Sequence, residues 1–95
     1  LEHIIPQSPA KGSNWERDFS QEFKKEYTYK LGNFTLLTTS MNSKAKNYDF
    51  SRKKLEYGKT NLGITRELTG LERIDENYIR ERHHKIVETL INGLF

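Results

Sequence analysis

Two neighbouring side chains at the start of the chain could do chemistry. Glu2 and His3 stand together in the stretch LEHIIPQS, which is otherwise mostly apolar. An imidazole titrates near pH ~6.5, so His3 can accept a proton at cellular pH, and the carboxylate beside it can bind a hard cation. A strand that only filled a core would need neither group. The pair is therefore either a chance pairing at a strand edge or part of a site.

Two asparagines could join this pair. Asn33 stands at the entrance to a β-rich stretch, FTLLTT, and Asn42 stands in the first turn of the helix predicted after it. If the two strands pair and this helix folds back on them, the four polar side chains converge. Each asparagine also has a plain structural interpretation, because Asn is frequent in turns and at helix starts.

The elements that must position these residues follow from local signals in the first part of the chain. Residues 1–5 predict a short strand that Pro6 ends, and residues 34–39 predict a second strand. Residues 6–14 are rich in Pro, Gly, Ser and Asn and predict a loop. Residues 14–30 predict either one helix capped by Asn14 or a helical turn with irregular flanks, and Gly32 marks a turn.

The rest of the chain is predicted to be mainly helical. Residues 40–58 predict a helix between an N-cap at Ser40 and a stop at Gly58, with a break near residues 47–49, and residues 61–70 predict a connection. Apolar residues then recur every three or four positions and predict an amphipathic helix of about five or six turns: Leu71, Ile74, Tyr78, Ile79, Ile86, Val87, Leu90, Ile91 and Leu94. The fold class is α+β, with two short antiparallel strands and a helix elaborated by further helices.

Composition limits the classes of protein to consider. The chain has 95 residues, enough for one small domain spanning residues 1–95, and eleven aromatic residues supply core material. It has no cysteine, which excludes a disulfide framework and a thiolate zinc site and favours a cytoplasmic setting. No apolar run approaches the length of a membrane span. The chain begins within a hydrophobic run and without Met, so we expect a C-terminal fragment of a larger protein.

Positive charge is concentrated after the second predicted strand. Residues 44–59 hold six basic and two acidic side chains, a local excess of four against a net charge of +3 for the whole chain. Such a ridge suits a polyanion, although a solvated helix face would give the same pattern.

The motif residues carry a resemblance. LEHIIPQS followed by GNFTLLTTSMNSKAKN resembles the HNH, or ββα-metal, endonuclease pattern, in which an acid–His pair closes the first strand, an Asn opens the second, and a His or Asn lies on the next helix. LGNFTLLT with MNSKAKNYDFSRKKLEY resembles, more narrowly, the C-terminal nuclease domain of GmrSD-type restriction endonucleases, bacterial enzymes that attack modified, mostly phage, DNA. EHIIPQS is also similar to part of the HNH domain of RNA-guided DNA nucleases. The resemblance covers residues 1–57 and only loosely the tail.

This resemblance implies a metal-dependent DNA endonuclease of anti-phage defence. His3 would be the general base, Asn33 would orient the His3 loop, and Glu2 and Asn42 would bind one Mg²⁺ or Mn²⁺ ion. The partner would be double-stranded DNA, held mainly through its phosphates, and an upstream domain of the same polypeptide would recognise the target. The expected phosphate contacts are Lys44, Lys46, Arg52, Lys53 and Lys54.

Other interpretations remain open. The family acid is often Asp, so Glu2 leaves room for a catalytically degenerate DNA-binding module of the same fold, and a helical protein-interaction domain is a third class. Arg52 could pair with Asp49 instead of DNA, and Asn47 is interpreted as a local cap rather than a second metal ligand. His83 and His84 are predicted to face solvent, and Trp15 is predicted to be a core residue or loop anchor.

Overall fold

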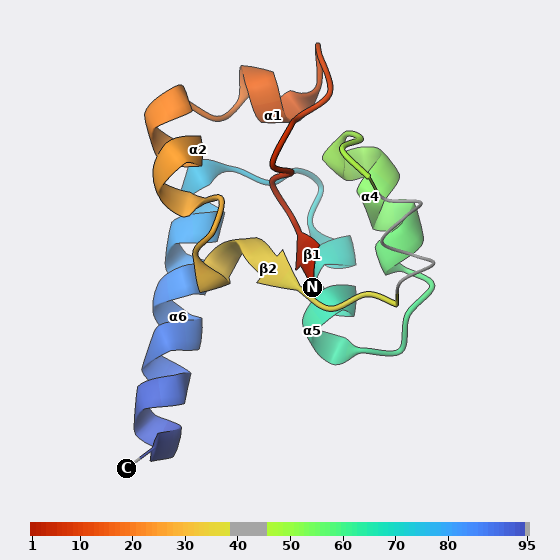
Figure 1. Cartoon of the computed structure of the whole chain (residues 1–95). Coiled ribbons are helices and arrows are strands. Elements are labelled where there is room, and N and C mark those ends of the chain that lie inside the picture. The colour runs from red at the N-terminus through yellow and green to blue at the C-terminus, as the bar shows by residue number, and fades with distance from the viewer. Residues whose placement is uncertain (39–45, 95) are drawn as a thin grey trace.

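A two-stranded antiparallel ladder occupies the centre of the molecule. The computed structural model describes residues 1–38 and 46–94, and in it strand β1 (Glu2–His3) pairs with strand β2 (Phe34–Thr35). Glu2 lies opposite Thr35 and His3 opposite Phe34 (Figure 1). Both strands are shorter than predicted, because the chain turns inward after His3 and buries Ile4 and Ile5 completely. The α+β class is confirmed.

The segment before β2 forms two short helices rather than one. Helices α1 (Asn14–Arg17) and α2 (Gln21–Tyr27) are separated at Ser20, whose hydroxyl accepts the backbone N–H of Phe23 and so caps the second helix. Trp15 on α1 is fully buried, and its indole N–H donates to the carbonyl of Tyr48. The prediction of a core or anchor residue at Trp15 is confirmed. A 3-10 turn, η1 (Leu31–Asn33), then leads into β2.

Helix α4 (Phe50–Tyr57) follows the predicted break at residues 47–49, and Gly58 stands at its end as expected. The side chain of Asn14 accepts the backbone N–H of Phe50, so a residue from α1 caps the start of α4. The expected N-cap Ser40, together with Asn42 and Lys44, lies outside the described residues.

The predicted connection at residues 61–70 is itself helical. It forms helix α5 (Gly63–Arg66) and the 3-10 helix η2 (Glu67–Gly70). Thr65 explains this difference, because its buried hydroxyl donates to the carbonyl of Leu36 and lies 2.8 Å from the hydroxyl of Thr35. The contact draws α5 against the chain that leaves β2.

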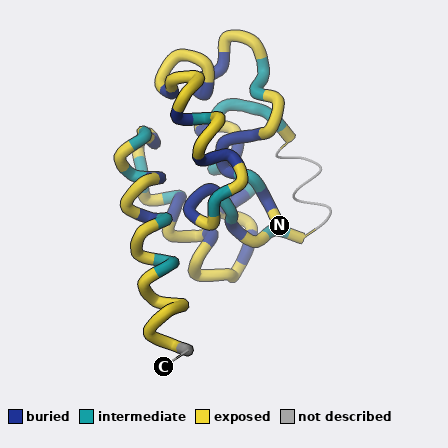
Figure 2. Tube along the Cα trace, turned by 60° about the vertical axis from the view of Figure 1, so that its left-hand side comes forward, coloured by how far each residue is buried: buried dark blue, intermediate teal, exposed yellow. Residues whose placement is uncertain are grey.

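The long C-terminal helix is confirmed as α6 (Glu76–Leu94). It begins later than the periodicity suggested, because the carboxylate of Asp75 accepts the backbone N–H of Tyr78 and starts the helix there. Close packing joins α6 to η1: a Cβ atom placed on Gly32 would lie 2.3 Å from the Cβ of His83. The other end of α6 extends past the rest of the molecule and is exposed (Figures 1 and 2).

Buried apolar side chains from the inward turn, from α1, α2, α4, η2 and α6, and from the links before α2 and α6 form the core. Its members are Ile4, Ile5, Trp15, Phe19, Phe23, Tyr27, Phe50, Tyr57, Leu68, Ile74 and Ile79. The core lies directly behind β1, so the strand that carries Glu2 and His3 is supported by packed residues.

Within residues 1–38 and 46–94, no helix combines the length and apolar character needed to cross a bilayer.

Candidate active site

His3 lies at a surface pocket of about 360 Å³. The pocket is lined by Glu2 and His3 from β1, the turn after this strand, and the segment before α4; these residues are Glu2, His3, Pro6, Gln7, Ser8, Lys46 and Asn47. Glu2 and His3 therefore share this pocket with Lys46 and Asn47, from the segment before α4.

The surroundings of His3 favour a neutral imidazole. The ring is half-buried, packs 4.5 Å from the ring of Phe34, and has Tyr29 at 5.6 Å on another side. Burial lowers the pKa of His3, and the positive charge of Lys53 lowers it further. The amide nitrogen of Gln7 lies 3.3 Å from Nε2, and because this nitrogen can only donate, the contact suits an unprotonated Nε2.

Asn33 joins the two strands from within the protein. Its side chain is completely buried, its Oδ1 accepts the N–H of Ile5 at 2.7 Å, and its Nδ2 donates to the carbonyls of Ile5 and Thr28. Its backbone carbonyl also accepts the N–H of Ile4. Both polar atoms of the side-chain amide are therefore bonded to the backbone. Two of the three bonds go to Ile5, which lies two positions after His3.

Helix α4 holds the other side of β1. The ammonium of Lys53 donates to Glu2 Oε2 at 3.0 Å and to the carbonyl of His3 at 2.7 Å, and the hydroxyl of Tyr57 donates to the same Oε2 at 2.9 Å. All of these side chains are buried. Burial lowers the pKa of Lys53 although Glu2 raises it, and burial together with Glu2 raises the pKa of Tyr57 well above its ordinary value.

This arrangement corrects the role expected of Lys53. Its side chain is 0% exposed and its ammonium is bonded to Glu2 and His3, so it cannot reach a phosphate at the surface. Lys53 instead anchors the strand that carries the acid–His pair. The sequence did contain a signal, since the helical period places Lys53 on the same face as the buried Phe50 and Tyr57.

The fit of a cation to Glu2 can be judged from its two oxygens. Oε2 is occupied by Lys53 and Tyr57, while Oε1 has no hydrogen-bond partner among the described residues. Oε1 is therefore the carboxylate oxygen left for a cation, on a side chain that lines the pocket and is only 3% exposed. Asn42, the other expected ligand, lies outside the described residues, and the part of the chain in view contains no cluster of three or more His, Cys, Asp or Glu side chains that could hold a metal.

The remaining basic residues differ in their availability. Lys46 is exposed at the pocket with a positive φ of 42°, and Arg52 is exposed with its guanidinium over the ring of Tyr48. No ion pair joins Arg52 to Asp49 among the residues the structure describes. The ammonium of Lys54 donates to the carbonyl of Leu71 at 2.8 Å, which ties it to the protein surface.

Three further polar residues have structural contacts. Asn47 donates through its side chain to the carbonyl of Ser8 and so links the segment before α4 to the loop after β1; it does not cap α4. His83 was expected to face solvent, but its Nδ1 accepts the N–H of Gly32 in the close contact between α6 and η1. His84 is exposed as predicted. Arg82 belongs to the tail that resembles the family only loosely and has no role assigned from the sequence: buried on α6, it donates to the carbonyls of Gly32 and Phe34.

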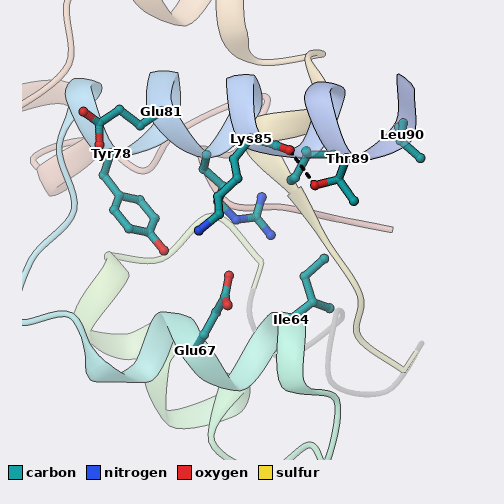
Figure 3. Close-up of a pocket in the computed structure, with 9 residues that line it drawn as sticks. Ile64, Glu67, Tyr78, Glu81, Lys85, Thr89 and Leu90 are labelled. Atoms are coloured by element: carbon teal, nitrogen blue, oxygen red, sulfur yellow. Dashed lines mark hydrogen bonds between the residues drawn. The ribbon is translucent and has the colours of Figure 1, made fainter. Parts of the chain in front are cut away.

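A larger pocket, of about 710 Å³, lies between α5 and α6. Figure 3 shows Glu67 directed toward α6, where Lys85 lies. Two acidic residues (Glu67 and Glu81) and two basic residues (Arg82 and Lys85) line it, so its charge is balanced. None of the candidate catalytic residues lines it, so the smaller pocket at His3 is the better candidate for the chemistry.

Of the comparisons with known proteins, one gave a match. Neither the curated proteins nor the solved structures yielded a match. The sequence model of one family, described as GmrSD restriction endonucleases, C-terminal domain, matches residues 1–89. The match spans β1, the turn at Asn33, α4 and most of α6, and the chain therefore belongs to the C-terminal domain family of the GmrSD restriction endonucleases.

Proposed function

We propose that this domain is a divalent-metal-dependent DNA endonuclease, the nuclease part of a bacterial restriction protein that acts against phage DNA. One observation carries the proposal: His3, with a lowered pKa, lines a surface pocket on a strand whose backbone is held by buried Asn33 and Lys53. A general base needs both a free proton-accepting form and a fixed position.

In this proposal His3 takes a proton from a water molecule in the pocket. The water oxygen forms a bond to phosphorus as the proton moves to the imidazole, and the bond from phosphorus to the 3′ oxygen breaks. The products are a 5′ phosphate and a 3′ hydroxyl, with the leaving oxygen protonated from solvent. Asn33 and Lys53 act as positioning residues, since both bond the backbone of residues 3–5 and neither side chain is exposed.

One Mg²⁺ or Mn²⁺ ion would be held by the free oxygen of Glu2 and the amide of Asn42. Such an ion, when bound, neutralises charge on the phosphate and the departing oxygen. The single available oxygen of Glu2 suits Mg²⁺, which keeps several waters and uses few protein ligands.

Phosphates would be bound by Lys44, Lys46 and Arg52. The burial of Lys53 removes it from this set, and Lys54 contributes less because its ammonium bonds Leu71. Phosphate contacts position DNA without reading its sequence, so we assign the choice of target to a domain before this one in the polypeptide.

The test is nicking of supercoiled plasmid by the purified protein. We expect relaxed or linear plasmid with Mg²⁺ or Mn²⁺ and intact plasmid with EDTA. Activity that persists undiminished in EDTA would contradict a metal-dependent mechanism, and no nicking with either ion would contradict the nuclease assignment.

A second candidate is a DNA-binding module of the same fold that no longer cleaves. The observation that favours it is the pairing of Glu2 with Lys53, which reduces the negative charge available to a cation. A gel shift of plasmid fragments in EDTA, without cleavage when Mg²⁺ is added, would select this candidate. Cleavage on addition of Mg²⁺ would reject it.

A further inference from the structure

Tyr29 is placed unusually for an aromatic residue of this protein. It follows α2, its side chain is 69% exposed, and among the aromatic side chains that the structure describes it alone is exposed. Its ring stands at 89° to the ring of His3, with the centroids 5.6 Å apart. The edge-to-face contact holds Tyr29 beside the candidate base and leaves most of its surface to solvent.

Tyr29 also lines a hollow that adjoins the pocket of His3. A hollow of about 640 Å³ runs along α2 and is lined in part by Tyr29, and it shares Pro6 and Gln7 with the pocket of His3. A strand of DNA whose scissile phosphate lay at His3 would therefore pass Tyr29 with an adjacent nucleotide.

The charge of this hollow argues against a phosphate site. Lys24 and Lys25 line it together with Glu16 and Glu22, so the formal charges cancel. The hydroxyl of Tyr29 has no hydrogen-bond partner among the described residues. What the hollow offers a ligand beside His3 is an exposed aromatic ring, a group that suits a nucleobase because every base has a π-face.

We propose that Tyr29 is a nucleobase-binding residue, which stacks on an unpaired or splayed base next to the phosphate at His3. The proposal rests on the assignment of DNA as the substrate of the His3 pocket. It adds a subsite on the α2 side of that pocket, and it accounts for an exposed aromatic ring that contacts His3 and lines the adjoining hollow.

The test measures binding without cleavage. Fluorescence anisotropy in EDTA compares a short oligothymidylate with an oligomer of equal length and charge in which every base is replaced by an abasic tetrahydrofuran. Stacking on one base is worth about tenfold or more in Kd, so we expect the wild-type protein to prefer the thymidylate by that factor. Tyr29→Ala should lose the preference, and Tyr29→Phe should keep it because the ring is retained.

Leu55→Ala is the matched control, since Leu55 on α4 is also 69% exposed and lines neither hollow. Thermal unfolding checks that all variants are folded. An equal preference in the wild type and Tyr29→Ala, or no preference in the wild type, overturns the proposal while DNA binding itself stands. Failure to bind either oligomer or plasmid DNA overturns the proposed function as well.

Discussion

The imidazole of His3 is surrounded differently from the other two histidines of the chain. His84 is exposed on α6, and His83 uses its Nδ1 to accept the N–H of Gly32. His3 alone lines the pocket with Glu2, and burial and Lys53 lower its pKa. These surroundings make His3 the histidine suited to proton transfer.

A lowered pKa has a defined effect on the pH dependence of cleavage. The imidazolium form of His3 loses its proton at a lower pH than a free imidazolium does, so the neutral base persists to lower pH. We expect the acid limb of kcat/KM for nicking to have its midpoint below the ordinary value of about 6.5. His84→Ala should leave the profile unchanged, and an acid midpoint clearly above 6.5 would contradict the environment described for His3.

Lys53 should matter more to folding than to DNA affinity. Lys53→Met leaves the buried carboxylate of Glu2 without its cation, which typically costs about 3–5 kcal/mol in the free energy of unfolding. The matched control is Lys59→Met, because Lys59 also pairs at 3.0 Å, with Glu56, but its own side chain is 55% exposed. That exposed pair should contribute at most about 1 kcal/mol. Urea denaturation measures both losses, and similar losses in the two variants would contradict the anchoring role of Lys53.

The contacts of Lys53 could not be predicted from the sequence alone. The charge pattern SRKK suggests a solvated basic face, and only the contacts from α4 to β1, across fifty residues of chain, reveal a buried ammonium. Glu2, His3 and Asn33 were identifiable because their residue types and order match a known motif. The partners of Glu2 were not, because they depend on how α4 packs against the strand.

The turn η1 connects the strand that carries His3 to the long helix. Asn33 binds Ile5 on one side, while Arg82 and His83 of α6 bind Gly32 on the other. The position of His3 therefore depends on packing between elements distant in sequence, and loosening η1 should affect catalysis and stability together.

Asn33→Ala tests this connection. The change leaves the N–H and the carbonyl of Ile5 without the side chain that bonds them. Each unsatisfied group lowers the free energy of unfolding by about 1–3 kcal/mol. We expect a lower melting temperature and slower nicking at temperatures where the variant is still folded. Asn77→Ala, at an exposed position on α6, is the control. Wild-type rate and stability in Asn33→Ala would reduce Asn33 to an ordinary turn residue.

Elements with a strong local signal were predictable and those set by tertiary contacts were not. The apolar spacing on α6 and the turn signals at Gly32 and Gly58 were sufficient to place these features. The start of α6 depended on Asp75, and α5 depended on the bonds of Thr65 to the chain after β2. The bond of Thr65 joins residues 29 positions apart, so no local pattern announces it. Asp75 lies only three residues before Tyr78, so this helix start did have a local signal, which the apolar spacing alone did not use.

Across the whole molecule, fewer basic side chains are free to bind DNA than the sequence suggested. Lys53 is buried and Lys54 is bonded, which leaves Lys46 and Arg52 as the exposed basic side chains of the original set that the structure describes. The isolated domain should accordingly bind DNA weakly, without sequence preference, and with a strong dependence on salt.

The salt dependence of DNA affinity can test these assignments singly. Lys46→Ala and Arg52→Ala should each reduce the slope of log K against log salt by about one unit, equally for unrelated sequences. Lys85→Ala, in the middle of α6 and in the pocket between α5 and α6 rather than at His3, should leave the slope unchanged. A preference for one DNA sequence that survives both Lys46→Ala and Arg52→Ala would place target recognition within these 95 residues.

The most direct measurement is the single-turnover nicking rate of plasmid DNA in Mg²⁺ for the wild type, His3→Ala and His84→Ala. If His3 is the general base, His3→Ala should be slower by about 10²–10⁴, with DNA affinity and melting temperature nearly unchanged, and His84→Ala should match the wild type. A His3→Ala protein that nicks plasmid at close to the wild-type rate would contradict the account.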